Sequence, residues 1–259
     1  MPTIASFNVN SINARLPNLS AWLRAVRPDV ACLQETKCLD AAFPREPIEE
    51  LGYNLATFGQ KSYNGVAILS RFPIEDPLLG LPGDPEDGQA RYLEVFTGGL
   101  RVASIYAPNG NPVGSEKFAY KLAWLERLRA HAGRLLELEE PVVLAGDFNV
   151  IPEPIDCHDP AAWAEDALFR PESRRAFRAL LHQGWTDAFR ALHPGERGAY
   201  TFWDYQGGAF QLDHGIRIDH LLLSPQAADR LERCWIDKEP RGRPKASDHT
   251  PILCSLRDG

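Results

Sequence analysis

The sequence predicts an α/β fold in which two packed, mixed β-sheets are flanked by helices, and two observations carry this prediction. Short apolar runs bounded by glycine, proline or polar residues recur along the chain, which is typical of buried strands. Three other segments place their apolar residues at helical spacing. Because strands outnumber long helices, we expect a layered α/β sandwich rather than an alternating parallel fold.

Four of the apolar runs end in polar groups of the kind that carry out chemistry. These segments are Ile4–Asn10, Val30–Glu35, Pro141–Asn149 and Ile216–Asp219, the last followed by Leu221–Leu223. A carboxylate at the end of a buried strand is costly unless it is paired or binds a metal, since desolvating an ion costs roughly several kcal/mol. The pattern therefore indicates that catalytic side chains gather at the ends of strands.

The remaining elements follow from spacing and from turn residues. Further strands are expected at Tyr53–Phe58, Gly65–Ser70, Tyr92–Thr97 and Leu100–Tyr106, separated by glycine, proline and aspartate turns. Helices are expected around residues 16–26, ending before Pro28, and at Ser115–Glu139 and Ser173–Gln183. The proline-rich stretch Pro152–Pro171, which includes the 156–159 segment, reads as a surface loop.

Composition indicates one domain spanning residues 1–259. Hydrophobic residues make up 44% and charged residues 24% of the chain, ordinary globular values. No apolar stretch approaches the ~18 residues that a membrane span needs, and no signal peptide opens the chain. We expect a cytoplasmic monomer without a membrane partner, associated with the nucleoid if the source is prokaryotic. The five cysteines include no C-x-x-C pair, so we expect free thiols.

The formal net charge of −7 is not the overall signature of a nucleic-acid binder. The basic residues nevertheless form clusters, which can grip phosphates locally on an acidic protein. Lys117 and Lys121 open a predicted helix, and Arg241, Arg243 and Lys245 precede the Asp-His pair near the C-terminus. Solvated charge runs are the alternative interpretation of both clusters.

If Glu35, Asp147, Asp219 and Asp248 converge, their repulsion requires a positive partner. Two carboxylates ~4 Å apart repel by roughly 4 kcal/mol at an effective dielectric constant near 20. Oxygen ligands of this kind suit Mg²⁺, with Mn²⁺ as a second candidate. Asp219 and His249 could form a carboxylate–imidazole pair in which the acid orients the ring and favours its charged form.

The chain carries a set of motifs in a characteristic order and spacing. They are Phe7–Asn10, Leu33–Lys37, Asn64–Ile68, Tyr106–Gly110, Gly146–Asn149, Arg217–Asp219 and Ser247–His249. This set resembles exonuclease III-type apurinic/apyrimidinic endonucleases of the endonuclease/exonuclease/phosphatase superfamily, from about Ile4 to Leu256. The resemblance implies a four-layered α/β sandwich, Mg²⁺ dependence and hydrolysis of DNA phosphodiesters.

The resemblance also assigns roles to single residues. Glu35 is similar to the principal metal ligand, assisted by Asn8 and by Asp248 through water. Asp147 resembles the residue that activates or positions the attacking water. The other implied catalytic positions are Asn149 beside water or phosphate, Tyr106 facing the phosphate, and the Asp219–His249 pair.

The implied substrate is double-stranded DNA that carries an abasic site or a blocked 3′ end. The expected cut lies 5′ to the abasic site and leaves a 3′-hydroxyl, with 3′-phosphodiesterase and 3′-to-5′ exonuclease activity expected beside it. Phe202 and Trp203 could line the sugar pocket or wedge into the duplex, and the alternative is that both are core aromatics. Further substrate contacts are expected at Asn10, Asn64, Asn109, Lys117, Lys121, Arg243 and Lys245.

Positions outside these motifs, and two other functions, complete the expectations. Trp185, Phe189 and His220 are expected to pack in the interior, and Asp187 to order neighbouring loops. One alternative is a phosphatase that acts on small phosphoesters such as inositol phosphates or nucleotides, which the acidic net charge favours slightly. The other is a non-catalytic nucleic-acid-binding protein that retains the fold.

Overall fold

Two six-stranded β-sheets form the centre of the protein, described here for all residues 1–259 by a computed structural model. The first sheet has the strand order β11-β12-β1-β2-β4-β3 and the second β5-β6-β7-β8-β10-β9. Both are mixed, because β1–β2 and β7–β8 are parallel pairs among antiparallel ones. The strands are β1 Thr3–Asn8, β2 Val30–Gln34, β3 Asn54–Phe58, β4 Val66–Ser70, β5 Ile74–Leu79, β6 Tyr92–Thr97, β7 Leu100–Tyr106, β8 Val142–Asp147, β9 Thr186–Asp187, β10 Asp219–Leu223, β11 Leu231–Ile236 and β12 Ile252–Leu256.

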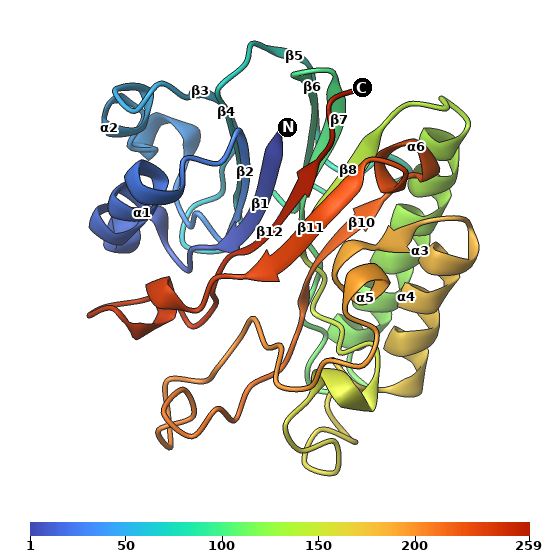
Figure 1. Cartoon of the computed structure of the whole chain (residues 1–259). Helices are drawn as coiled ribbons and strands as arrows, with labels where there is room; N and C mark the ends of the chain where they lie inside the picture. The colour runs from blue at the N-terminus through green and yellow to red at the C-terminus, as the bar shows by residue number, and fades with distance from the viewer.

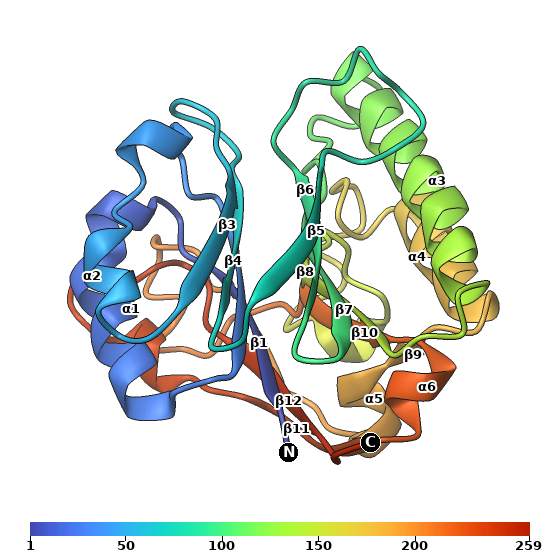
Figure 2. The same cartoon turned by 90° about the horizontal axis from the view of Figure 1, so that it is seen from above.

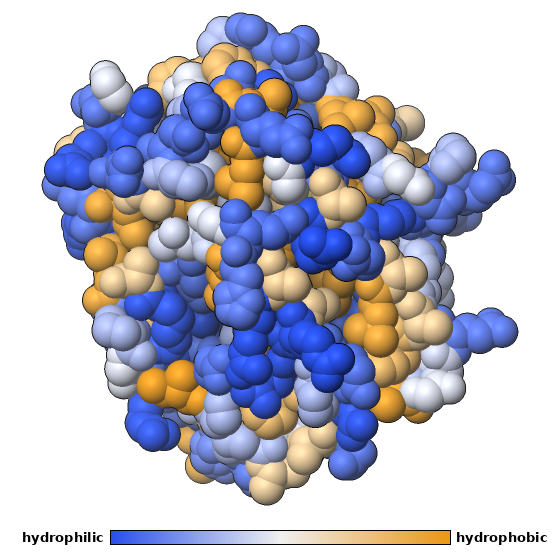
Figure 3. All heavy atoms as spheres, turned by 90° about the vertical axis from the view of Figure 1, so that its right-hand side faces the viewer, coloured by the Kyte–Doolittle hydropathy of each residue, from blue (hydrophilic) through white to orange (hydrophobic).

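Helices cover the outer faces of both sheets, which confirms the predicted four-layered α/β sandwich. Figure 2 shows α1 and α2 outside the first sheet, and α3 and α4 outside the second. The face that Figure 3 presents is largely hydrophilic, with scattered apolar residues. No helix has both the length and the apolar character to cross a membrane. The helices are α1 Ile12–Val26, α2 Glu46–Glu49, α3 Glu116–Leu136, α4 Pro171–His182, α5 Ala188–Leu192 and α6 Pro225–Ala228.

Three apolar layers lie between the four layers of structure, because successive strand residues point to opposite faces. Ile4 lies between the two sheets, whereas the next residue, Ala5, packs toward α1. Val143 and Leu144 divide in the same way between the inter-sheet layer and the layer under α3 and α4. The side chains of the strands are therefore fixed on both faces, and the strand ends form a rigid rim.

The structure corrects two of the predicted boundaries. The segment 216–219 is not a strand that ends in Asp219, because Ile216 makes only isolated bridges to two loops. Asp219 instead opens β10. The helix expected at Ser173 begins at Pro171, whose missing N–H costs nothing in the first turn. The strands β5, β9, β11 and β12 were not predicted, and the five cysteines are buried free thiols.

Candidate active site

The polar groups at the strand ends meet at one end of the sandwich, the lower end in Figure 1. Asn8 ends β1, and Glu35 directly follows β2. Asp147 ends β8, where its register partners are Tyr106 of β7 and Asp219 of β10. Because β10 runs antiparallel to β8, the first residue of β10 lies beside the last residue of β8. The expected convergence of these side chains is therefore present.

The Asn8 side chain links the two sheets at the centre of this site. Its Nδ2 donates to Glu35 Oε1 at 2.8 Å and to Asp147 Oδ2 at 3.0 Å. Its Oδ1 accepts a hydrogen bond from the backbone N–H of Asn10 at 3.0 Å. Asn8 is fully buried, so one amide sets the spacing between carboxylates that belong to different sheets.

His249 lies between two carboxylates. Its Nδ1 is 2.8 Å from Asp219 Oδ2, and its Nε2 is 3.7 Å from Asp147 Oδ2. Burial disfavours the charged ring, but the attraction of Asp219, and then of Asp147, outweighs burial and raises the pKa of His249 to about 10. The imidazole is therefore charged near neutral pH, with one N–H held by Asp219 and the other directed toward Asp147.

Glu35 is held by a lysine that the sequence analysis did not single out. Lys37 Nζ lies 2.7 Å from Glu35 Oε2 and donates to Asn10 Oδ1 at 2.6 Å. Burial opposes ionisation of Glu35, but Lys37 and the hydrogen bond from Asn8 outweigh it, so the pKa of Glu35 lies below its usual value. Glu35 is consequently an ionised carboxylate.

Asp147 has the opposite electrostatic situation. Burial, together with repulsion from Asp219 and Glu35, outweighs the attraction of His249 and raises the pKa of Asp147 to about 7. The backbone N–H of Asn149 donates to Asp147 Oδ1 at 2.9 Å and orients the carboxylate. A carboxyl group with a pKa near the working pH can both accept and release a proton.

Tyr106 contributes a hydroxyl beside the carboxylates. Burial, and then the charges of Glu35 and Asp147, raise the pKa of Tyr106 well above its usual value. The guanidinium of Arg91 lies 4.9 Å from the centre of the Tyr106 ring. The hydroxyl therefore stays protonated and can donate a hydrogen bond to an anion.

The acidic side chains fit a divalent cation. Glu35, Asp147 and His249 each present one ligand atom within 4.8 Å of the others. His249 is unsuited as a ligand, because a metal-bound imidazole must be neutral. The carboxylate oxygens are the hard donors that Mg²⁺ and Mn²⁺ prefer. Asp248 lies outside this group, since its Oδ1 accepts a hydrogen bond from Asn10 Nδ2 at 3.0 Å.

Asn149 ties together the loops that follow β7 and β8. Its Nδ2 donates to the backbone carbonyl of Ala107 at 2.9 Å, and its Oδ1 accepts from Asn109 Nδ2 at 3.4 Å. Its backbone adopts a left-handed conformation with φ 49°, which Asn tolerates better than most residues. Glu35 and Asn64 are left-handed as well, with φ 53° and 52°. Strained backbone of this kind is concentrated at functional sites.

The prediction that Lys121 contacts substrate is wrong for any direct contact. Its side chain is 0% exposed, and its Nζ donates to the backbone carbonyls of Asn109 at 3.0 Å and Asn149 at 2.5 Å. Burial lowers the pKa of Lys121 to about 7, against the opposing attraction of Asp147. The ammonium is enclosed beneath the loops and cannot reach a phosphate in solution.

Lys117, one turn earlier on α3, lies on the outside. It lines an open groove of about 470 Å³ together with Asn64, Asn109, Arg91 and Tyr63. The three residues predicted here from sequence, Asn64, Asn109 and Lys117, thus share one surface depression. Its lining is polar and partly basic, which suits a phosphate backbone.

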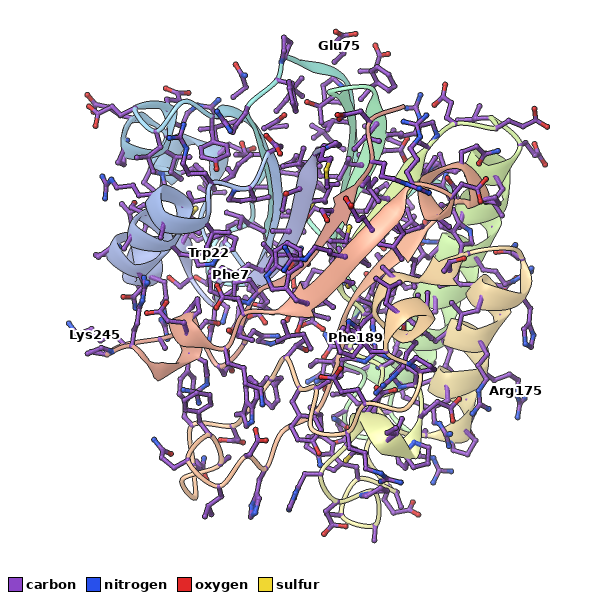
Figure 4. The ribbon with its side chains drawn as sticks, viewed as in Figure 1. Phe7, Trp22, Glu75, Arg175, Phe189 and Lys245 are labelled. Atoms are coloured by element: carbon purple, nitrogen blue, oxygen red, sulfur yellow. The ribbon has the colours of Figure 1, made fainter.

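A second groove lies across the site, beside the start of α1. It is lined in part by Arg15, Tyr205, Arg241, Arg243 and Lys245. Arg243 is partly engaged, because it pairs with Glu239 at 2.7 Å. Lys245 is exposed and extends away from the body of the protein in Figure 4. This groove therefore has a positive lining at the position where the sequence predicted it.

Asn10 and Tyr205 connect that groove to the catalytic residues. Asn10 Nδ2 donates to the Tyr205 hydroxyl at 3.2 Å, and Arg15 donates to the same hydroxyl at 3.0 Å. The Tyr205 hydroxyl in turn donates to the backbone carbonyl of Ala246 at 2.9 Å. Asn10 is engaged in this network while remaining partly exposed.

The two aromatic candidates have separate positions. Trp203 is 0% exposed, and its Nε1 donates to Asp213 Oδ1 at 3.0 Å. A fully enclosed side chain cannot wedge into DNA, so the core interpretation applies to Trp203. Phe202 is half-buried, with its ring centre 5.0 Å from that of His249 in an edge-to-face arrangement. Phe202 is thus the aromatic residue that faces the site.

Behind the site, a second group of buried charges fastens loops to β10. Arg217 pairs with Asp156 at 2.7 Å and with Asp187 at 2.9 Å, and Arg190 also contacts Asp156. Asp187 caps α5 by accepting from two of its backbone N–H groups, which confirms its expected ordering role. His220 is buried as expected. Asp156, predicted to lie in a surface loop, is instead fully buried because these arginines neutralise it.

Several residues of the site escaped the sequence analysis. The structure places Lys37 against Glu35, Arg91 against Tyr106, and Arg15 and Tyr205 in the basic groove. Lys37 stood two residues from a motif carboxylate, which was a usable signal. The others are ordinary polar residues whose position depends on contacts between distant segments.

Comparison with known proteins accounts for this geometry. Residues 5–249 match the model of the endonuclease/exonuclease/phosphatase family. The chain belongs to this family. Exodeoxyribonuclease III of Haemophilus influenzae is 34% identical, with 97% of this chain and 98% of that protein covered.

Solved structures agree with this family membership. An AP endonuclease from Archaeoglobus fulgidus superimposes with a TM-score of 0.95 at 40% identity, covering 99% of both chains. A 3′-5′ exonuclease from Neisseria meningitidis superimposes with a TM-score of 0.96 at 39% identity, covering 99% of this chain and 100% of that one. The predicted family, fold and enzyme class, a hydrolytic DNA repair nuclease, are confirmed.

Proposed function

We propose that this DNA repair nuclease is a Mg²⁺-dependent phosphodiesterase that cuts double-stranded DNA 5′ to abasic sites and also removes 3′-blocking groups. One observation carries the proposal. Asp147, a buried carboxyl group whose pKa is raised to about 7, lies between the ionised Glu35 and the charged Asp219–His249 pair. Such a site combines a group that can accept a proton from water with donors that stabilise negative charge on a phosphate.

The residues divide the reaction between them. Asp147 accepts a proton from water as the water oxygen forms a bond to phosphorus. The bond from phosphorus to the 3′ oxygen breaks, and that oxygen takes a proton from solvent water and leaves as a 3′-hydroxyl. His249 and the Tyr106 hydroxyl donate to the phosphate oxygens, since both carry a proton near neutral pH. Asn149 orients Asp147 through its backbone N–H.

The cation has a defined place in this proposal. Glu35 would be its principal protein ligand, with Asn8 assisting and Asp248 assisting through water. A bound divalent ion would supply Lewis-acid stabilisation of the phosphate charge. Lys37, whose Nζ lies 2.7 Å from Glu35 Oε2, keeps that carboxylate ionised.

The two grooves favour a polymeric substrate. One depression carries Lys117, Asn64 and Asn109, and the other carries Arg243 and Lys245. A small phosphoester would need only the catalytic residues, whereas a duplex uses positive and polar surface on both sides. Phe202 is the proposed wall of the pocket for the base-less sugar, because its ring stands edge-on to His249.

The relatives support both proposed activities and do not choose between them. One similar structure is described as an AP endonuclease and another as a 3′-5′ exonuclease, at 40% and 39% identity. A third, from Neisseria at 37% identity, is described as a 3′ phosphatase bound to a product DNA hairpin. The balance between cutting at abasic sites and processing 3′ ends is therefore a property to be measured.

The test is a comparison of three substrates under one set of conditions. The purified protein is incubated with a duplex that contains one synthetic abasic site, a duplex with a 3′-phosphate end, and a nucleoside monophosphate, each with Mg²⁺ and with EDTA. We expect a Mg²⁺-dependent cut immediately 5′ to the lesion and phosphate release from the blocked end. Turnover of the monophosphate alone would favour a small-molecule phosphatase, and binding of DNA without turnover in any metal would favour the non-catalytic alternative.

A further inference from the structure

The most unusual residue outside the proposed chemistry is the buried lysine of α3. Lys121 has no exposed surface, yet a buried ammonium costs roughly several kcal/mol after relaxation. An apolar residue of the same length would fill this space at a lower cost. The specific use of its N–H groups therefore needs an explanation in terms of what they hold.

Lys121 joins the two loops that carry the catalytic residues. Its Nζ donates to the carbonyl of Asn109, three residues after Tyr106, and to the carbonyl of Asn149, two residues after Asp147. Tyr106 and Asp147 are the paired last residues of the parallel strands β7 and β8. The lysine therefore links the two loops that directly follow Tyr106 and Asp147.

The surrounding backbone is shaped to receive this side chain. Gly110 has φ +90°, and a Cβ there would lie 2.6 Å from Lys121 Cδ. The 107–111 loop therefore wraps closely around the lysine stem. Asn149, whose carbonyl Lys121 holds, has the left-handed φ of 49° that aims its N–H at Asp147 Oδ1. The contact with Lys121 stabilises this strained turn.

We infer that Lys121 is a positioning residue, which sets the separation and orientation of Tyr106, Asp147 and Asn149 without touching DNA. The inference rests on the proposed function, because it assigns these three residues to the chemistry. A misplacement of about 1 Å in a catalytic group can cost about 10²-fold in rate. Loss of the ammonium should consequently lower kcat and leave KM and DNA affinity unchanged.

The experiment compares Lys121→Met with Lys117→Met, its matched control on the same helix. Met keeps the length of the lysine stem and removes only the ammonium. For Lys121→Met we expect kcat to fall by about 10²-fold on abasic duplex, with KM, thermal unfolding and the salt dependence of DNA binding close to wild type. For Lys117→Met, in contrast, we expect weaker binding, a higher KM and a salt slope reduced by about one.

Three outcomes decide between the roles. If Lys121→Met weakens DNA binding and flattens the salt dependence, Lys121 is a phosphate ligand and the inference is wrong. A normal kcat in a well-folded Lys121→Met protein also overturns the inference, because the ammonium would then not contribute to the rate. If wild-type protein cuts none of the DNA substrates, the proposed function fails instead, which separates the two conclusions.

A second variant keeps the inference testable if Lys121→Met does not fold. Gly110→Ala leaves every functional group in place and displaces the lysine stem, since the added Cβ would approach Lys121 Cδ too closely. We expect a reduced kcat at unchanged KM. A normal kcat for a folded Gly110→Ala protein would contradict the inference.

Discussion

Two groups of charged side chains lie at and behind the candidate site, and they differ in the cations that face their aspartates. The candidate catalytic group contains three carboxylates and a single imidazole, and Lys37 pairs with one of the carboxylates. The structural group contains two carboxylates and two guanidinium groups. They are, respectively, Glu35, Asp147, Asp219 and His249, and Asp156, Asp187, Arg190 and Arg217.

One aspartate from each group makes the difference visible. Asp147 and Asp156 are both almost fully buried. Burial with two neighbouring carboxylates raises the pKa of Asp147 to about 7, whereas the two arginines overcome burial and lower the pKa of Asp156. Burial alone therefore does not make a reactive carboxyl group. A buried carboxyl group that faces other carboxylates can accept a proton or a cation, whereas one paired with two guanidinium groups is structural.

The largest expected effect on the rate comes from removing the imidazole of His249 or its carboxylate partner, Asp219. His249→Ala or Asp219→Asn should reduce kcat by about 10²–10³-fold, because removing one hydrogen-bond donor to the developing negative charge costs about that much. Single-turnover cleavage of abasic duplex measures the effect, and circular dichroism checks the fold. Asp219→Asn should also lower the pKa of His249, followed by NMR. Near-normal rates in both variants would remove the pair from the mechanism.

In the structural group, an uncompensated charge should cost stability instead of rate. Arg217→Met leaves Asp156 and Asp187 with one fewer buried partner, and breaking a buried ion pair costs about 3–5 kcal/mol. Urea unfolding measures the loss. Arg178→Met, which removes a half-exposed partner of Glu153, is the control and should cost less than about 1 kcal/mol. Equal stability of the two variants would contradict the division into two groups.

A smaller change in the catalytic group tests its need for a cation. Glu35→Gln removes one negative charge and keeps the shape of the side chain, so the Mg²⁺ concentration at half-maximal rate should rise by about tenfold or more, equivalent to about 1.4 kcal/mol. A Mg²⁺ titration of the cleavage rate provides the value. Glu153→Gln, in the loop behind the site, should leave the titration unchanged. An identical midpoint for Glu35→Gln would exclude it as a ligand.

The smallest expected effect is on the pH dependence of stability and concerns His220. Its Nε2 donates to the carbonyl of Val150, and its Nδ1 lies 3.0 Å from Arg217 Nη1. Burial, and then Arg217, lower the pKa of His220 from its usual value to about 4. The folded state thus binds fewer protons than the unfolded state, and stability should fall as pH decreases from about 6.5 through 4. His220→Phe should reduce this slope by up to one proton. An unchanged slope in unfolding experiments at several pH values would show that His220 does not titrate there.

The catalytic side chains were predictable because each stands at a visible break in the apolar pattern. Asp147 follows the run 142–145, and Glu35 follows the run 30–33, so both announce a strand end. The strand β11, by contrast, mixes exposed charges with half-buried apolar residues and offers no clear period. Asp219 was expected to end a strand, whereas it begins one. An apolar run in the sequence does not show at which residue the backbone hydrogen bonds of a strand begin.

The grooves were only partly predictable. Charge clusters indicated Lys117 and Lys245, and the structure places both on exposed surface that lines a groove. Spacing could not distinguish the exposed Lys117 from the buried Lys121. Residues four positions apart lie on the same face of a helix, and how deeply each is buried depends on the loops that cover it. Trp203 and Phe202 also differ in burial, because adjacent residues of an extended segment point to opposite sides.

By itself, the sequence determined the layered fold and the polar groups at the ends of its strands, because periodicity and turn residues are local properties of the chain, and its motifs predicted which of those groups react. Only the tertiary structure decided which charges are balanced. Whether Asp147 has a raised pKa and Asp156 a lowered one depends on partners 34 to 112 residues away, brought close by strand pairing and loop packing. Electrostatic energy depends on distance in space, which separation along the chain does not report.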